Sequence, residues 1–367
     1  MILYIILIVM ILLGGCLGIN DTQRAKKIYL TFIFSILTLV SSLRAYSVGV
    51  DTMQYIKAYT LIKNIPWSEY GTLWYEWGFF ALCKVLNYIT SDPQILILVS
   101  SIFIMSSVGR FIYKNSSNVV ISSFLFLTLN LYFNYMNIMR QAIAISIILI
   151  GYEYLKENKL IKYSAIVILA SLFHQSALCC LVLIIFKKVR YNKIIMIGWG
   201  IISSIAFIFW KVFYEISVTF LSKYEGYSQG IFGVSNYFGA IFEFAVNIFI
   251  LLFGLLVFKI SNKGFNRVKL IGDIEYEKKI ELLAWIVSSV VFFSIITIRI
   301  NIFNRITSYF LIFTIVWLAE AIEIIKFKNE KLLYKYAIIF FTFWYCIIIL
   351  IFRPEWTGVV PYKLFFL

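Results

Sequence analysis

Hydrophobic residues are grouped in long blocks along the chain, and short polar segments separate them. A helix needs roughly 17 to 25 apolar residues to cross about 30 Å of hydrocarbon. Blocks of about this length lie at 1–19, 28–43, 94–113, 119–136, 138–155, 194–215, 237–258, 281–299, 306–325 and 336–352. Because lipid offers the backbone no hydrogen-bonding partner, each block is expected to be an α-helix. The pattern predicts an all-α, polytopic transmembrane bundle of about ten full spans, forming one integral membrane domain over 1–367.

The composition supports a membrane protein. Hydrophobic residues make up 62% of the chain and charged residues only 14%, with a mean hydropathy of +0.91. An average soluble domain is about a quarter charged, so the chain is not expected to fold in water, and the lipid bilayer is its expected surroundings. The net charge of +15 could suggest nucleic acid. The basic residues occur in short runs between apolar blocks, however, and we expect no nucleic-acid partner.

Basic runs set the predicted topology. They lie at 20–27, 156–162, 187–193, 259–279 and 326–335. The positive-inside rule places all of them on the cytoplasmic face. Segment 163–186 lies between two of these runs, so it must enter the membrane and return as a re-entrant hairpin.

Counting membrane crossings in the same way predicts a long outer loop at 44–93, in which 76–90 forms an amphipathic helix at the interface. Further outer stretches are expected at 221–236 and 353–367. Because long connections in compact proteins are usually functional, the 44–93 loop is of most interest.

Ionisable groups at the edges of spans are costly and therefore indicate sites. The largest set of polar residues is predicted to share one helix face. It comprises Asn130, Asn134, Asn137 and Gln141, with the ionisable Arg140 beside them. These residues could bond neighbouring helices together. Alternatively, the arginine could offer a guanidinium to an anionic ligand such as a phosphate.

A second polar face follows the apolar block at 281–299. It comprises Asn301, Asn304, Arg305 and Ser308, with Arg299 at the edge of the preceding span. Arginines gathered on one water-accessible side suit a diphosphate. Snorkelling of long basic side chains to the interface is the alternative.

Two residues could take part in proton transfer. His174 is the sole histidine and lies near the midpoint of 163–186. It is either a satisfied buried residue or an acid–base group. Asp51 lies on the outer loop, where it either caps a helix that also carries Tyr55 or acts as a functional carboxylate. We expect no metal and no cofactor, since neither a metal-ligand spacing nor a glycine-rich phosphate loop is present.

Several segments, taken in order, resemble the EpsG family of Wzy-like polymerases over roughly residues 44–363. They are Gly49-Val-Asp51-Thr52 with Tyr55, Glu76-Trp-Gly-Phe, Asn137-Ile-Met-Arg140-Gln141-Ala142, Phe173-His174-Gln-Ser176-Ala177, and Arg305-Ile-Thr-Ser-Tyr309 with Pro361-Tyr362-Lys363. Arg299 and Arg305 compete for the late arginine position. The arginine-glutamine and phenylalanine-histidine segments lie about 30 residues apart and together are fairly specific.

The resemblance implies a metal-independent glycosyltransferase on the outer face of the bacterial cytoplasmic membrane. It would join oligosaccharides carried on undecaprenyl diphosphate, for capsule, exopolysaccharide or O-antigen. Arg140 with Arg305 or Arg299 would hold diphosphate, His174 would assist proton transfer, and Asp51 would orient acceptor sugars. The remaining expected substrate contacts are Asn137, Gln141, Tyr55, Glu76, Asn301, Tyr309, Tyr362 and Lys363. Loop aromatics such as Trp74 and Tyr75 would stack on sugars or belong to an interfacial belt.

Other functions stay open at this stage. A flippase for lipid-linked oligosaccharides also needs cations facing a cavity, although no internal repeat is visible. A ligase that moves finished chains to another acceptor shares the same chemistry, and a membrane acyltransferase is a weaker alternative. The sequence reveals neither the sugars and their linkage nor whether a chain-length regulator is a partner.

Overall fold

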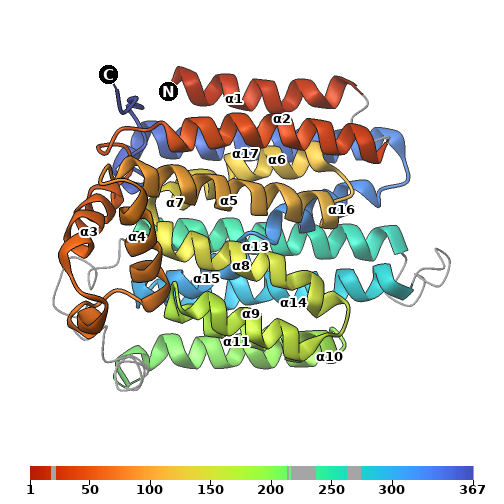
Figure 1. Cartoon of the computed structure of the whole chain (residues 1–367). Helices are drawn as coiled ribbons and strands as arrows, with labels where there is room; N and C mark the ends of the chain where they lie inside the picture. Colours follow the sequence, from red (N-terminus) through yellow and green to blue (C-terminus); the bar gives the residue numbers. More distant parts are fainter. Residues whose placement is uncertain (18–21, 213–214, 216–236, 263–273, 367) are drawn as a thin grey trace. The chain divides into compact units, whose positions relative to one another are not determined.

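A computed structural model describes residues 1–17, 22–212, 215, 237–262 and 274–366 (Figure 1). Its regular elements over these ranges are all helices, and the β-pairing found there is one isolated bridge between Arg44 and Leu364. The all-α prediction is therefore confirmed. The predicted outer stretch 221–236 and part of the basic run 259–279 lie outside the described residues.

The chain forms two compact units, 1–178 with 327–367, and 179–326. The first unit contains α1 (Ile2–Leu13), α2 (Gln23–Ser42), α3 (Thr52–Asn64), α4 (Trp77–Ile89), α5 (Gln94–Asn115), α6 (Val119–Thr128), α7 (Leu131–Asn137), α8 (Met139–Lys156), α9 (Leu160–Ser171) and α17 (Lys328–Phe352). Short 3-10 turns follow at Gly14–Leu17, Trp67–Thr72 and Pro354–Trp356. Helix α5 packs against α2 and α8, and α8 packs against α9. Buried apolar side chains of these helices form the core of this unit.

The second unit is built around one buried helix. Its elements are α10 (Val182–Lys188), α11 (Lys193–Ile208), α13 (Tyr237–Asn262), α14 (Ile274–Thr297), α15 (Asn304–Leu311) and α16 (Thr314–Glu323), with 3-10 turns at Gln175–Leu181, which spans the boundary between the units, and Asn301–Phe303. Helix α14 contacts every other helix among the described residues of the unit. The most apolar 18-residue window of α14 is 83% buried, which identifies it as the central helix.

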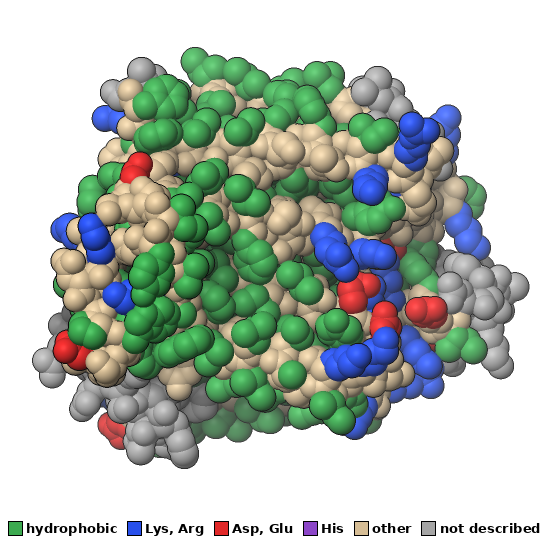
Figure 2. All heavy atoms as spheres, in the orientation of Figure 1, with side chains coloured by type: hydrophobic (Ala, Val, Ile, Leu, Met, Phe, Trp, Pro, Cys, Tyr) green, Lys and Arg blue, Asp and Glu red, His purple; other side chains and the backbone are tan. Residues whose placement is uncertain are grey.

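Several helices are long and apolar enough to cross a membrane. Among the described residues, five pass this test, namely α2, α5, α13, α14 and α17, and up to seven pass if each of two bent pairs counts as one span. Apolar side chains cover much of the face shown in Figure 2, as expected for contact with lipid. The chain is therefore a multi-pass helical membrane protein, and the count of ten spans remains a prediction.

The polar stripe predicted on one helix face does not lie on one helix. Asn130 adopts a left-handed conformation with φ of 61°, and α6 and α7 meet there at 54°. Helix α7 then ends at Asn137, and α8 begins at Met139. The expectation of a continuous face was wrong because an asparagine accepts positive φ at low cost. The stripe is divided among two helices and the turn before them.

Segment 163–186 is interrupted at its centre. Helix α9 ends at Ser171, His174 lies in the following turn, and α10 begins at Val182. No single helix crosses this segment, which is compatible with a re-entrant hairpin, although that course stays a prediction. Segment 76–90 contains helix α4, as expected, with Phe79 buried and Tyr88 exposed. Its predicted position at the membrane interface is untested.

Candidate functional site

The first unit brings three separate segments of the chain together at Glu76. This carboxylate forms an ion pair with Arg140, in the first turn of α8. Its other oxygen accepts a hydrogen bond from the backbone N–H of Gln175, at 3.4 Å. Arg140 is 6% exposed, so the pair is largely shielded from solvent and holds its geometry better than a surface pair. Glu76 thus connects α8 to the turn that carries His174.

Aromatic rings surround the guanidinium of Arg140. Its central carbon lies 4.5 Å from the ring centre of Trp74, 5.2 Å from that of Tyr75 and 5.8 Å from that of Phe79. Such contacts attract a cation electrostatically and restrict its orientation. Tyr55 lies beside these rings, with its ring centre 5.8 Å from that of Phe79, and its hydroxyl is affected by the charge of Arg140. Burial raises the pKa of this hydroxyl, and the charge of Arg140 opposes the shift.

Arg140 keeps one donor unused inside the protein. Its Nε atom is buried and has no hydrogen-bond partner among the described residues. A guanidinium has five N–H donors in a rigid fork, and a buried donor without a partner is costly. The arginine is therefore held by Glu76 and the rings, and one of its donors is enclosed without a partner.

The His174 turn docks closely on the start of α4. The backbone N–H of Gly78 donates to the carbonyl of Leu172 at 2.7 Å. A Cβ added at Gly78 would lie 2.8 Å from that same oxygen, so only glycine fits without a backbone shift. Beyond this contact, His174 is 4% exposed and its Nδ1 lies 2.6 Å from the Ser176 hydroxyl, which orients the ring.

The Gly78 contact yields a test of this docking. Gly78→Ala is expected to push α4 away from the Leu172 carbonyl and to lower activity at least about tenfold, because misplacing catalytic groups by about 1 Å can cost about a hundredfold. The matched control is Gly71→Ala, since a Cβ there meets nothing within 4 Å. The activity of membranes that contain equal amounts of each variant measures the difference. Equal activity of Gly78→Ala and Gly71→Ala would show that the close approach is unimportant.

Asn137 joins the segment that precedes α3 to the C-terminal segment. Its Oδ1 accepts from the Val50 backbone N–H at 2.5 Å, and its Nδ2 donates to the Thr357 carbonyl at 2.7 Å. Beside it, Gly49 has φ of 98° and donates its N–H to the Gly358 carbonyl at 2.8 Å. Both ends of the Asn137 amide are used within the protein, which favours a positioning role over the predicted substrate contact.

Asp51 immediately follows this turn. It occupies the N-cap position of α3, but its side chain makes no capping hydrogen bond. Helix α3 therefore begins where the sequence predicts, while the capping interpretation of Asp51 is not supported. After burial, the carboxylate is a further cause that raises the pKa of Tyr55, which lies beside Arg140. This interaction relates Asp51 to the Glu76 and Arg140 pair.

The remaining predicted residues of the first unit are mainly used in packing. The Tyr362 hydroxyl donates to the Val40 carbonyl at 2.8 Å. Lys363 is exposed, and its backbone carbonyl accepts from the Ala45 N–H at 2.9 Å. Gln141 is 3% exposed on α8. The contacts of Tyr362 and Lys363 fasten the C-terminal segment beside the end of α2.

The other predicted residues belong to the second unit. Arg299 is exposed at the end of α14, with its guanidinium carbon 4.8 Å from the Phe207 ring and 5.8 Å from the Tyr237 ring. Asn301 is exposed, whereas Arg305 is partly buried and Tyr309 is 1% exposed on α15. Their roles with diphosphate and sugars stay predictions. No group of three or more potential metal ligands occurs within the described parts of the chain.

The candidate residues could be identified singly from the sequence, but the contacts between them could not. The structure brings Tyr55, Glu76 and Arg140 together and places the His174 turn against them. The ion pair was not predicted, nor were the contacts of Trp74 and Tyr75 with the guanidinium, while their stacking on sugars stays a prediction. One available signal was the glycine in Glu76-Trp-Gly-Phe, since a glycine inside an apolar helix often marks a close approach.

Comparison with known proteins gives one result. The sequence model of the EpsG family matches residues 27–364, which is nearly the whole chain. No curated protein and no solved structure matches this chain.

Proposed function

Because the chain belongs to the EpsG family of Wzy-like polymerases, we propose that it joins lipid-linked oligosaccharide repeat units into a polysaccharide. The donor is a growing chain on undecaprenyl diphosphate, and the acceptor is a sugar hydroxyl of the next lipid-linked unit. The reaction takes place at the outer face of the bacterial cytoplasmic membrane. The product would be a capsule, exopolysaccharide or O-antigen.

The contact of Glu76 with Arg140 and with the His174 turn supports this proposal most directly. The two bonds join residues that lie 64 and 99 positions apart in the sequence. Each of the three segments carries part of the resemblance to the family. Their meeting at one carboxylate indicates that these segments serve one site.

The proposed reaction is a substitution at the anomeric carbon of the donor. The acceptor oxygen forms a bond to that carbon while the bond to the diphosphate oxygen breaks, and undecaprenyl diphosphate leaves with the electron pair. Arg140 stabilises the charge that develops on the leaving diphosphate. His174 takes the proton of the acceptor hydroxyl, and Asp51 orients the acceptor sugar.

The ion pair with Glu76 has a further consequence for turnover. A guanidinium that is already balanced by a carboxylate binds diphosphate less tightly than an uncompensated one. Weak binding of the product suits a polymerase, which must release undecaprenyl diphosphate after every addition. Tight and equal binding of substrate and transition state would not raise the rate.

The test is to identify the lipid-linked species that accumulate when the gene is deleted. A polymerase deletion should leave single repeat units at the outer face, and the wild-type protein should restore long chains. His174→Ala, once its membrane insertion is verified, should leave the single units unjoined, as the deletion does. Single units retained at the inner face would instead indicate a flippase, and full-length chains left on the lipid would indicate a ligase.

A further inference from the structure

A pocket lies within the second unit, and none of the residues proposed for catalysis lines it. It encloses about 380 Å³ between the end of α10 and the start of α14. The charged side chains that line it are Lys187, Lys188, Arg190, Lys278, Glu277 and Glu281. Four basic and two acidic groups give the lining a net charge of +2. A hollow of this charge is suited to an anion.

The wall of the pocket is firmly attached to α14. The Phe186 ring stacks on Trp285 with centroids 5.6 Å apart, and the indole N–H donates to the Val189 carbonyl at 3.0 Å. The Tyr191 hydroxyl lies 3.0 Å from the Ser288 hydroxyl. These contacts hold both sides of residues 187–190 in place. The pocket is therefore formed before any ligand arrives, which reduces the entropy lost on binding.

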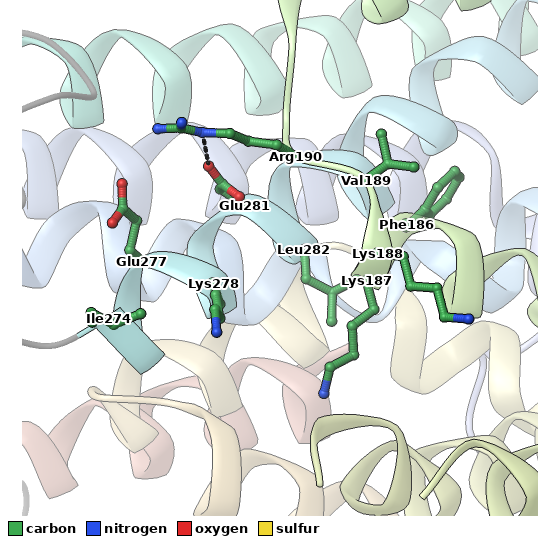
Figure 3. A pocket seen from close by; sticks show the side chains of 10 residues that line it. All are labelled: Phe186, Lys187, Lys188, Val189, Arg190, Ile274, Glu277, Lys278, Glu281 and Leu282. Carbon is green, nitrogen blue, oxygen red and sulfur yellow. Dashed lines mark ion pairs between the residues drawn. The ribbon is translucent and has the colours of Figure 1, made fainter. Parts of the chain in front are cut away.

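The charges within the pocket are separated. Figure 3 shows the carboxylates of Glu277 and Glu281 on one side, where Glu281 pairs with Arg190 at 3.4 Å. The amino groups of Lys187 and Lys278 point to the opposite side. This arrangement offers lysines from two different helices to one ligand. A phosphate group, with several acceptor oxygens and a negative charge, fits it chemically.

We infer that this pocket binds a phosphate-bearing anion, with the headgroup of an anionic membrane lipid as one source and a soluble phosphate compound as the other. The basic run 187–193 is predicted to lie at the cytoplasmic face of the membrane. Basic pockets on that face are suited to anionic headgroups. The site is independent of the proposed polymerase chemistry, since it shares none of its residues.

The test uses the purified full-length protein in detergent with two probes, dihexanoylphosphatidylglycerol and inorganic phosphate. Replacing Lys187, Lys188 and Lys278 with glutamine should weaken lipid binding on the order of 100-fold, because each basic residue near an anionic headgroup contributes roughly fivefold. A control that replaces Lys326, Lys328 and Lys335 with glutamine removes the same charge elsewhere and should bind as the wild type does. Calorimetric titration measures each affinity.

A second variant separates loss of the site from loss of the fold. Glu277→Gln removes a negative charge from the lining, so it should tighten binding about fivefold, a gain that misfolding cannot produce. Binding of the lipid alone identifies a headgroup site, and comparable binding of both probes identifies the phosphate as sufficient. The inference is overturned if neither probe binds the wild type, or if the triple variant and its control bind equally.

Discussion

Replacing Arg140 with alanine is expected to abolish polymer synthesis and leave lipid-linked single units unjoined. The variant loses the cation that would stabilise the leaving diphosphate, and removal of one such electrostatic contact typically lowers the rate by about a hundred- to a thousandfold. Arg140→Lys should recover part of the activity because it keeps the charge but loses the planar fork. Chain lengths of polysaccharide extracted from cells that express each variant in a deletion background provide the measurement.

A second arginine provides the matched control. Arg353 also pairs with a glutamate, Glu355, but this pair is exposed and its charged atoms are 3.7 Å apart. Exposed pairs contribute little, so Arg353→Ala should make polymer of wild-type length. Both variants must first be shown to insert into the membrane in equal amounts. If Arg140→Ala then made polymer of wild-type length, Arg140 could not serve the diphosphate.

The helical fold could be predicted from the sequence because one physical constraint decides it. Apolar blocks in lipid must satisfy their own backbone hydrogen bonds, so segments such as α5 and α14 are helices whatever their neighbours are. The break at Asn130 could not be predicted in this way. Its left-handed conformation and the 54° bend depend on how the buried helices pack, and the local spacing of polar residues fits a continuous helix equally well.

The candidate site was predictable by residue type but not by pairing. An arginine at the edge of a span and a lone histidine in an apolar segment are unusual enough to be noticed singly. Their arrangement depends on Glu76, which is 64 positions from Arg140 and 99 from Gln175. No local pattern encodes such distances. The bond from Asn137 to Thr357, 220 positions away, could not be predicted for the same reason.

Replacing Glu76 with glutamine is expected to destabilise the protein by about 3 kcal/mol, because it leaves the buried guanidinium of Arg140 without its counter-charge. This value is at the lower end of the range for breaking a buried ion pair, since the Glu76 side chain remains 15% exposed. The double variant Glu76→Gln/Arg140→Gln should recover much of that loss while remaining inactive, so stability and activity are separated. Unfolding in detergent, followed through exposure of the buried Cys83 and Cys346 thiols, measures the coupling. The stability losses of Glu76→Gln alone and Arg140→Gln alone are compared with that of the double variant. If the two losses simply add, the ion pair contributes nothing and another interaction must orient Arg140.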